Sequence, residues 1–180
     1  MVVHDYLRSI SPLGIIVMGV AGSGKSTLGT ALAGAISCPF LEGDDFHSPE
    51  SVAKMRAGTA LTDDDRWPWL DRLGHAIGAK VASDGVAVAT CSALKRAYRD
   101  RLRAVIPTPV GFVMPDVAPE ELLRRLTART NHYMPPSLLT SQLATLERPR
   151  PDEPALTLDA QHSVAALCEQ TIAWLLQGRK

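Results

Sequence analysis

A nine-residue run near the N-terminus, residues 19–27 (GVAGSGKST), limits what this chain can be more than any other feature. It matches the pattern G-x-x-x-x-G-K-[ST], follows an apolar run at 15–18 and precedes a helix-like run at 27–36. In such a strand–loop–helix unit the backbone N–H groups turn inward around a phosphate, and the helix N-terminus adds its positive dipole end. The alternative is a turn rich in glycine and serine that binds nothing, but the flanking pattern favours a nucleoside triphosphate site. Its predicted residues are Gly19, Val20, Ala21, Gly22, Ser23, Gly24, Lys25, Ser26 and Thr27.

Two side chains of this loop have predicted chemical roles. Lys25 is expected to reach the β- and γ-phosphates, and the Ser26 hydroxyl is expected to bind Mg²⁺.

Composition narrows the class of protein further. With 180 residues the chain is long enough for one domain, which we expect to span 1–180. The 19 Lys and Arg residues balance the 19 Asp and Glu residues, so no basic field predicts nucleic acid as a partner. The three cysteines form no C-x-x-C pair, and no run of apolar residues is long enough for a membrane span or a secretion signal. We therefore expect a cytoplasmic protein that acts on a small molecule, with no nucleic-acid or membrane partner.

Strand-like and helix-like segments alternate along the chain, which predicts an α/β fold with a parallel sheet and helices on both faces. The expected strands lie at 15–20, 38–41, 86–91, 110–114 and 155–158. The expected helices lie at 27–36, 48–57, 65–82, 94–105, 119–129, 137–146 and 163–176.

The motifs typical of GTPases and of motor and transporter ATPases are missing. The only asparagine, Asn131, is followed by histidine, so no N-K-x-D motif is present to read guanine. The third strand ends at residues 89–91 (ATC) without the aspartate that usually serves Mg²⁺. Two other carboxylates, Glu42 and Asp44, lie two residues apart after a short strand, so both point to the same side at the edge where the P-loop begins. The alternative is a solvated acidic turn.

Together these segments resemble the gluconokinase family, which comprises small P-loop kinases. The resemblance rests on the P-loop at 19–27 and on residues 40–70 (FLEGDDFHSPESVAKMRAGTALTDDDRWPWL), 91–103 (CSALKRAYRDRLR) and 122–147 (LLRRLTARTNHYMPPSLLTSQLATLE). It implies ATP-dependent phosphorylation of D-gluconate at the 6-hydroxyl, with Mg²⁺. It also implies a five-stranded parallel sheet of order 2-3-1-4-5, as in shikimate and nucleoside monophosphate kinases. A homodimer, a helical substrate-binding region at about 45–82 and a lid at about 129–142 are implied as well.

The resemblance assigns roles on the acceptor side of the site. Asp44 would meet the acceptor hydroxyl as a catalytic residue, and Glu42 would hold the metal through water, although many relatives are expected to have aspartate there. A buried gluconate carboxylate needs a fixed cation, and Arg66 is the first choice because its guanidinium can bind the carboxylate in a bidentate way. The alternative for the charged run at 63–66 is a solvated helix N-terminus.

Further substrate contacts are expected from the tip of the third strand and from the family pattern. Ser92 and Lys95 follow that strand, where doubly wound sheets bind their ligands. By resemblance, His47, Lys54 and His132 also face the substrate. Trp67 and Trp69 are interpreted as core anchors in preference to sugar-facing aromatic residues.

Arg125 and Arg129 lie four residues apart on one helical face, which leads into the expected lid at Arg129. By resemblance the first lies on adenine and the second on the phosphates, where it would act in catalysis. An exposed helical pair would have the same spacing.

Two other functions stay open at this point. One is a P-loop kinase of another small hydroxy acid, such as shikimate. The other is a nucleotide-binding regulator without turnover, although Asp44 is the acceptor-side carboxylate that such a protein would not need.

Overall fold

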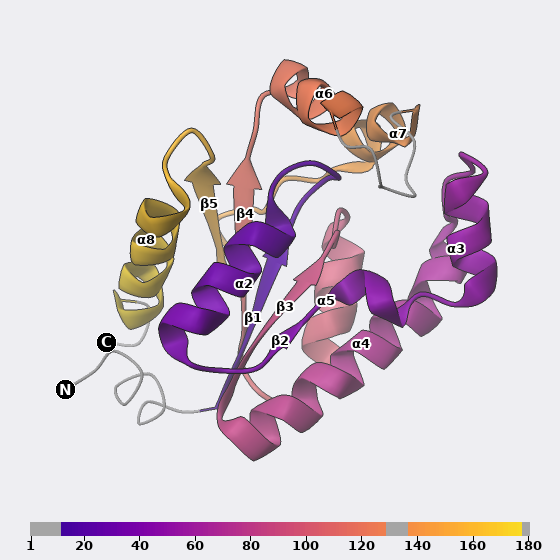
Figure 1. Cartoon of the computed structure of the whole chain (residues 1–180). Coiled ribbons are helices and arrows are strands. Elements are labelled where there is room, and N and C mark those ends of the chain that lie inside the picture. The colour runs from indigo at the N-terminus through magenta and orange to yellow at the C-terminus, as the bar shows by residue number, and fades with distance from the viewer. Residues whose placement is uncertain (1–11, 129–136, 178–180) are drawn as a thin grey trace.

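A computed structural model of the chain describes residues 12–128 and 137–177. Its five strands form one parallel sheet in the order β2-β3-β1-β4-β5 (Figure 1). The strands are β1 (Leu13–Met18), β2 (Phe40–Leu41), β3 (Val86–Cys91), β4 (Val110–Asp116) and β5 (Ala155–Asp159). The α/β class and the strand order predicted from the sequence are confirmed.

Helices cover both faces of the sheet, with α2 and α8 on one face and α4 and α5 on the other (Figure 1). The helices are α2 (Lys25–Ile36), η1, a short 3₁₀ helix (Gly43–Phe46), α3 (Pro49–Arg56), α4 (Asp63–Asp84), α5 (Arg96–Val105), α6 (Pro119–Ala128), α7 (Ser137–Thr145) and α8 (Val164–Gln177). None of the helices within 12–128 and 137–177 is long and apolar enough to cross a membrane.

Strand β1 shows how the sheet divides the core. Its alternate residues point to opposite faces, so Ile15 and Val17 pack with the α2 and α8 side chains, whereas Ile16 and Met18 pack with those of α4 and α5. All four are fully buried. Because both faces are covered, the strand has no polar residue, as expected for a parallel sheet.

The register of β1 and β3 brings two loops together at the carboxyl edge of the sheet. Met18 pairs with Cys91, so both strands end at the same level. The P-loop begins at Gly19, and its amide donates a hydrogen bond to the carbonyl of Ser92 at 3.1 Å. Residues after β1 and residues after β3 are therefore neighbours, as a ligand site at this edge requires.

Helix α4 begins at Asp63, two residues before its predicted start. Thr62 caps it: the Thr62 hydroxyl accepts a hydrogen bond from the amide of Asp65 at 3.2 Å, and the Asp65 carboxylate accepts one from the amide of Thr62 at 2.9 Å. The capping box accounts for Asp65, and all three consecutive aspartates lie in the first turn, where negative charge is favourable.

The connection from β2 into η1 runs against β3. A Cβ atom on Gly43 would lie 1.9 Å from the carbonyl oxygen of Thr90, so only glycine allows this approach. The close contact fixes where the residues on either side of Gly43, Glu42 and Asp44, lie relative to the sheet.

We therefore predict that Gly43→Ala lowers the free energy of unfolding by about 2–4 kcal/mol, because the new methyl group forces η1 away from β3. Urea denaturation measures the change. Gly34→Ala is the matched control, since Gly34 lies exposed in α2 with no atom near the added Cβ. It should raise stability by up to about 1 kcal/mol, as alanine is the better helix former. Equal stability of the Gly43→Ala variant and the wild type would contradict the close-approach argument.

Candidate active site

The P-loop has the backbone conformation that its glycines predict. Gly22 and Gly24 have φ angles of 81° and 91°, and Gly24 is the N-cap of α2. These left-handed residues turn the loop over the start of the helix, where free N–H groups and the helix dipole favour an anion. The Lys25 ammonium donates to the carbonyl of Val20 at 3.0 Å and so lies against the loop.

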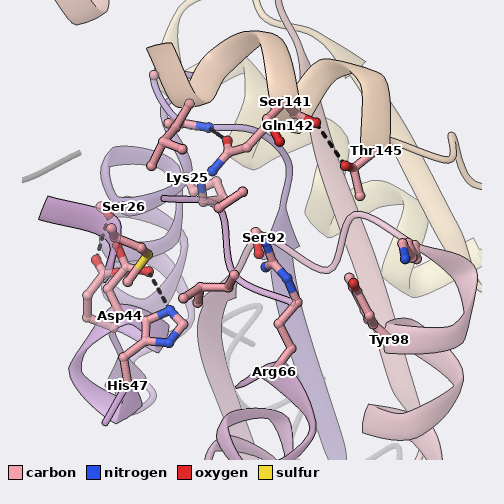
Figure 2. A pocket seen from close by; sticks show the side chains of 18 of the residues that line it. Lys25, Ser26, Asp44, His47, Arg66, Ser92, Tyr98, Ser141, Gln142 and Thr145 are labelled. Carbon is pink, nitrogen blue, oxygen red and sulfur yellow. Dashed lines mark hydrogen bonds and ion pairs between the residues drawn. The ribbon is translucent and has the colours of Figure 1, made fainter. Parts of the chain in front are cut away.

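A cavity, named here the central cavity, lies between the P-loop, η1, the start of α4, the end of β3 and α7 (Figure 2). Besides P-loop residues, it brings together six side chains that the sequence predicted for the metal or the acceptor. These are Glu42, Asp44, His47, Arg66, Ser92 and Lys95.

On the metal side, Glu42 connects three elements. One of its carboxylate oxygens accepts a hydrogen bond from the Ser26 hydroxyl of α2 at 2.5 Å, and the other accepts one from the Thr90 hydroxyl of β3. Thr90 in turn accepts a hydrogen bond from the amide of Gly43 at 3.0 Å. Where β3 lacks an aspartate, its threonine thus holds the carboxylate of the residue that follows the neighbouring strand β2.

This donor set fits Mg²⁺, which prefers hard oxygen ligands and keeps several waters, so one hydroxyl and one carboxylate suffice. Across the described residues no group of three or more His, Cys, Asp and Glu side chains could form a dedicated cage for a metal ion. The arrangement is therefore of the kind that holds Mg²⁺ together with substrate phosphates.

On the acceptor side, Asp44 lies in η1 and His47 directly follows this helix. His47 Nε2 lies 3.8 Å from Asp44 Oδ1, and the imidazole stacks on Trp69 with ring centroids 4.1 Å apart. Trp69 is buried and donates to the carbonyl of Gly43 at 2.8 Å, so it is a core anchor. Burial lowers the pKa of His47 from 6.5 to about 4, with a smaller opposing effect of Asp44. The imidazole is therefore neutral at pH 7.

The cationic side of the cavity contains two groups with different partners. The Lys95 ammonium donates to both oxygens of Asp63 at 2.9 and 3.1 Å. The Tyr98 hydroxyl also donates to Asp63, and this bond and the one from Lys95 lower the pKa of the Asp63 carboxyl. Arg66 lies over the Tyr98 ring, with Cζ 5.5 Å from the centroid. Its buried Nε has no hydrogen-bond partner among the described residues, so this donor is left for a bound ligand to satisfy.

Several cavity residues were not identified from the sequence. They are Asp63 as the partner of Lys95, Tyr98, and the α7 residues Ser141, Gln142 and Thr145. Tyr98 had a detectable signal, because it lies three residues after Lys95 at the start of a helix and shares its face. The α7 residues were not singled out individually. Ser141 and Gln142 fall within the predicted lid at about 129–142, whereas Thr145 lies outside it.

Two predicted residues lie elsewhere. Lys54 of α3 forms an ion pair with Asp65 at 2.7 Å and does not line the central cavity. Arg125 lines a second hollow, named here the outer groove, on the other side of the P-loop. Its guanidinium is 3.5 Å from the carbonyl of Gly22. The outer groove is also lined by Gly24, Thr27, His162 and Ser163.

Part of the predicted lid lies outside the described residues, together with the predicted sites Arg129 and His132. The described part, residues 137–142, forms the first turns of α7. Leu138 and Leu139 are buried there, against α3 and the P-loop respectively.

A P-loop followed by α2, a serine and a carboxylate that fit Mg²⁺, and an acceptor-side cavity define a P-loop kinase. Comparisons agree with this class. Residues 15–149 match a family model described as an AAA domain. The gluconokinase of Gluconobacter oxydans is 43% identical over 169 residues, which cover 94% of each chain. The thermosensitive gluconokinase of Escherichia coli is 41% identical and covers 91% of this chain, which spans 89% of it. A crystal structure of a gluconokinase from Sinorhizobium meliloti superposes with a TM-score of 0.80 at 46% identity, covering 93% of this chain and 94% of that one. The chain belongs to the gluconokinase family.

The neutral state of His47 generates a prediction about pH. The unfolded chain takes up the proton near pH 6.5, whereas the folded protein takes it up only near pH 4. The unfolded state therefore binds more protons in this window, and stability falls as the pH drops from 7 to 4. Between pH 7 and 4, His47 accounts for a decrease of about 3 kcal/mol in the free energy of unfolding, and this decrease should be absent in His47→Gln.

Urea denaturation at pH 7, 5.5 and 4 measures the free energy of unfolding of the wild type and the variant. His75→Gln, at an exposed position of α4, is the matched control and should follow the wild-type slope. A His47→Gln slope equal to that of the wild type would contradict the burial argument.

Proposed function

We propose that this chain transfers the γ-phosphoryl group of ATP to the 6-hydroxyl of D-gluconate, giving 6-phospho-D-gluconate and ADP. The observation that carries the proposal is the central cavity itself. It contains the P-loop at one end and, at the other, a carboxylate and an arginine suited to a hydroxy acid. The family relationship supports the same reaction.

The donor half of the reaction depends on charge neutralisation and positioning, because the transition state of phosphoryl transfer is loose. The P-loop amides and Lys25 hold the β- and γ-phosphates. Ser26 and Glu42 would hold Mg²⁺, and the ion would neutralise phosphate charge. Thr90 orients the Glu42 carboxylate, so the metal side is preorganised.

The acceptor half depends on the residues around Arg66. The gluconate carboxylate binds the Arg66 guanidinium, whose Nε otherwise lacks a hydrogen-bond partner within the described residues. Ser92 and the Lys95–Asp63 pair bind hydroxyl groups of the sugar acid. Asp44, with 41% of its side chain exposed to the cavity and solvent, orients the 6-hydroxyl and accepts its proton. His47 lies beside Asp44 and is neutral, so it does not offset the charge of the Asp44 carboxylate.

The adenine belongs in the outer groove. This groove adjoins Gly22 and Gly24 of the P-loop, as a nucleotide held through its phosphates requires, and Arg125 offers a guanidinium plane for stacking. We further propose a cytoplasmic homodimer that uses Mg²⁺, on the basis of the family resemblance.

The proposal is tested by coupled ADP-release assays over a panel of acceptors. Gluconate with Mg-ATP should turn over far faster than shikimate, AMP or glycerate, with kcat of about 1–100 s⁻¹, the usual range for kinases. Equal or faster turnover of another hydroxy acid would favour the shikimate-type alternative, and no turnover with any acceptor would favour a nucleotide-binding regulator.

A second prediction concerns Asp44. Asp44→Asn should lower kcat about 100-fold or more and leave ATP affinity nearly unchanged, because the amide cannot accept the hydroxyl proton. Steady-state kinetics and nucleotide titration measure the two effects. Asp45→Asn is the matched control, since the adjacent Asp45 is exposed and outside the cavity. A near-normal kcat for Asp44→Asn would remove this residue from the mechanism.

A third prediction concerns Arg66. Arg66→Ala should raise the KM for gluconate about 10- to 100-fold, the loss expected for a bidentate charge-assisted contact. The KM for ATP should change little. Arg103→Ala, on the exposed side of α5, is the control. An unchanged gluconate KM would place the substrate carboxylate elsewhere.

A further inference from the structure

Residues 137–147, named here the bridge segment, contact both loops between which the phosphoryl group must pass. At one end, the Gln142 side-chain oxygen accepts a hydrogen bond from the amide of Ala21 in the P-loop at 2.7 Å. At the other end, the amide of Glu147 donates to the carbonyl of Leu94 at 2.8 Å, and the Glu147 carboxylate accepts from the amide of Arg96 at 2.8 Å. Leu94 and Arg96 belong to residues 92–96, named here the acceptor loop. Figure 2 shows Gln142 directed at the P-loop beside Lys25.

Apolar packing joins the same three parts. Val20 and Ala21 of the P-loop, Leu94 of the acceptor loop and Leu139 of the bridge segment are buried in one cluster. Leu143 and Leu146 pack against this cluster from the bridge segment. The hydrogen bonds therefore lie at the ends of a continuous apolar contact that joins the bridge segment to both loops.

The buried side chain of Arg99 also holds the acceptor loop in place. The Arg99 guanidinium is fully buried and donates to the carbonyls of Ala93 and Leu94 at 3.0 and 3.3 Å. It is bidentate to the buried carboxylate of Glu153, with N–O distances of 2.5 and 3.0 Å. The acceptor loop is thus fixed to the core. The hydrogen bond from the Gly19 amide to the Ser92 carbonyl joins only the first residues of the two loops, so the spacing of the residues beyond them depends on how the P-loop is held.

We propose that the bridge segment sets the spacing of the phosphoryl-donor and acceptor loops, with Gln142 and Glu147 as positioning residues. The inference rests on the proposed function for the identity of the acceptor. Reacting groups must approach to about 3–3.5 Å, and a displacement of about 1 Å can reduce the rate 100-fold. Glu147 does not line the central cavity and is exposed, so its contribution acts through the acceptor loop.

The first experiment removes the distal contact. Glu147→Ala should lower kcat about tenfold while the KM values for ATP and for the acceptor stay within twofold, since alignment is lost and binding is not. Glu147→Gln should restore kcat, because the side-chain oxygen still accepts from the Arg96 amide. Arg148→Ala, which removes only the adjacent surface ion pair with Asp116, is the control and should behave as the wild type. A wild-type kcat for Glu147→Ala, or a Glu147→Gln variant as slow as the alanine variant, would overturn the proposal.

The second experiment breaks the other end. Gln142→Leu should also lower kcat about tenfold, and the double variant should be no slower than either single variant, because one broken contact already releases the bridge. Multiplicative effects in the double variant would contradict a shared role. These comparisons use whichever acid the wild type phosphorylates fastest, so the identity of the substrate is judged separately.

A third measurement needs no turnover. In the wild type a non-hydrolysable ATP analogue should slow amide hydrogen exchange in the acceptor loop, and Gln142→Leu should abolish this protection although the analogue still binds. Arg148→Ala should keep it. Protection that persists in Gln142→Leu, or that is missing in the wild type, would overturn the proposal even if gluconate proves not to be the acceptor.

Discussion

The hydrogen bonds that Glu42 accepts from Ser26 and Thr90 hold together the three elements on which the site depends. Ser26 lies in the first turn of α2, Glu42 directly follows the two-residue strand β2, and Thr90 lies near the end of β3. A strand of two residues has little pairing of its own, so side-chain contacts and the approach of Gly43 to β3 must fix its position. Once Gly43 is fixed, η1 follows, and with it the orientation of Asp44 and His47. The metal side and the acceptor side are therefore positioned by one local constraint.

Lys95 and Arg66, two cations of the cavity, differ in whether they are already paired with a carboxylate. Lys95 is neutralised by Asp63 and can offer a neutral hydrogen-bonding pair, which suits hydroxyl groups. Arg66 has an aromatic ring beside it and no anion bonded to its buried Nε in the described structure, which suits a carboxylate. An arginine that is partly desolvated and not already paired binds an anion more strongly than one that must first give up an ion pair. These contacts support the proposal that the acceptor is an acid that also carries hydroxyl groups.

The sequence predicted the fold well, because the fold depends on local signals. Alternating apolar runs and helical periodicity located every strand and helix of the sheet layers, and the contiguous P-loop pattern located the loop between β1 and α2. The boundaries shifted where side-chain caps decide them, as Thr62 does for α4. The 3₁₀ helix η1 was not predicted, since its conformation follows from the contact of Gly43 with Thr90 of β3, which is distant in sequence.

The acceptor half could be predicted only in part, because it is assembled from four segments that folding brings together. Individual charged residues such as Arg66 and Lys95 could be singled out by type and by family pattern, but their partners could not. Lys95 pairs with Asp63, 32 positions away, and Gln142 pairs with Ala21, 121 positions away. No periodicity in the sequence encodes contacts over such separations.

The donor loop and the acceptor residues also differ in what fixes their geometry. A donor loop encoded by one contiguous run keeps its internal geometry wherever the fold places it, whereas its distance to the acceptor residues is a property of tertiary packing. Control over the rate of transfer, as distinct from nucleotide binding, therefore depends on the residues that join the halves. These are Glu42 and the Gly19–Ser92 contact at the sheet edge and, in our proposal, Gln142 and Glu147 of the bridge segment.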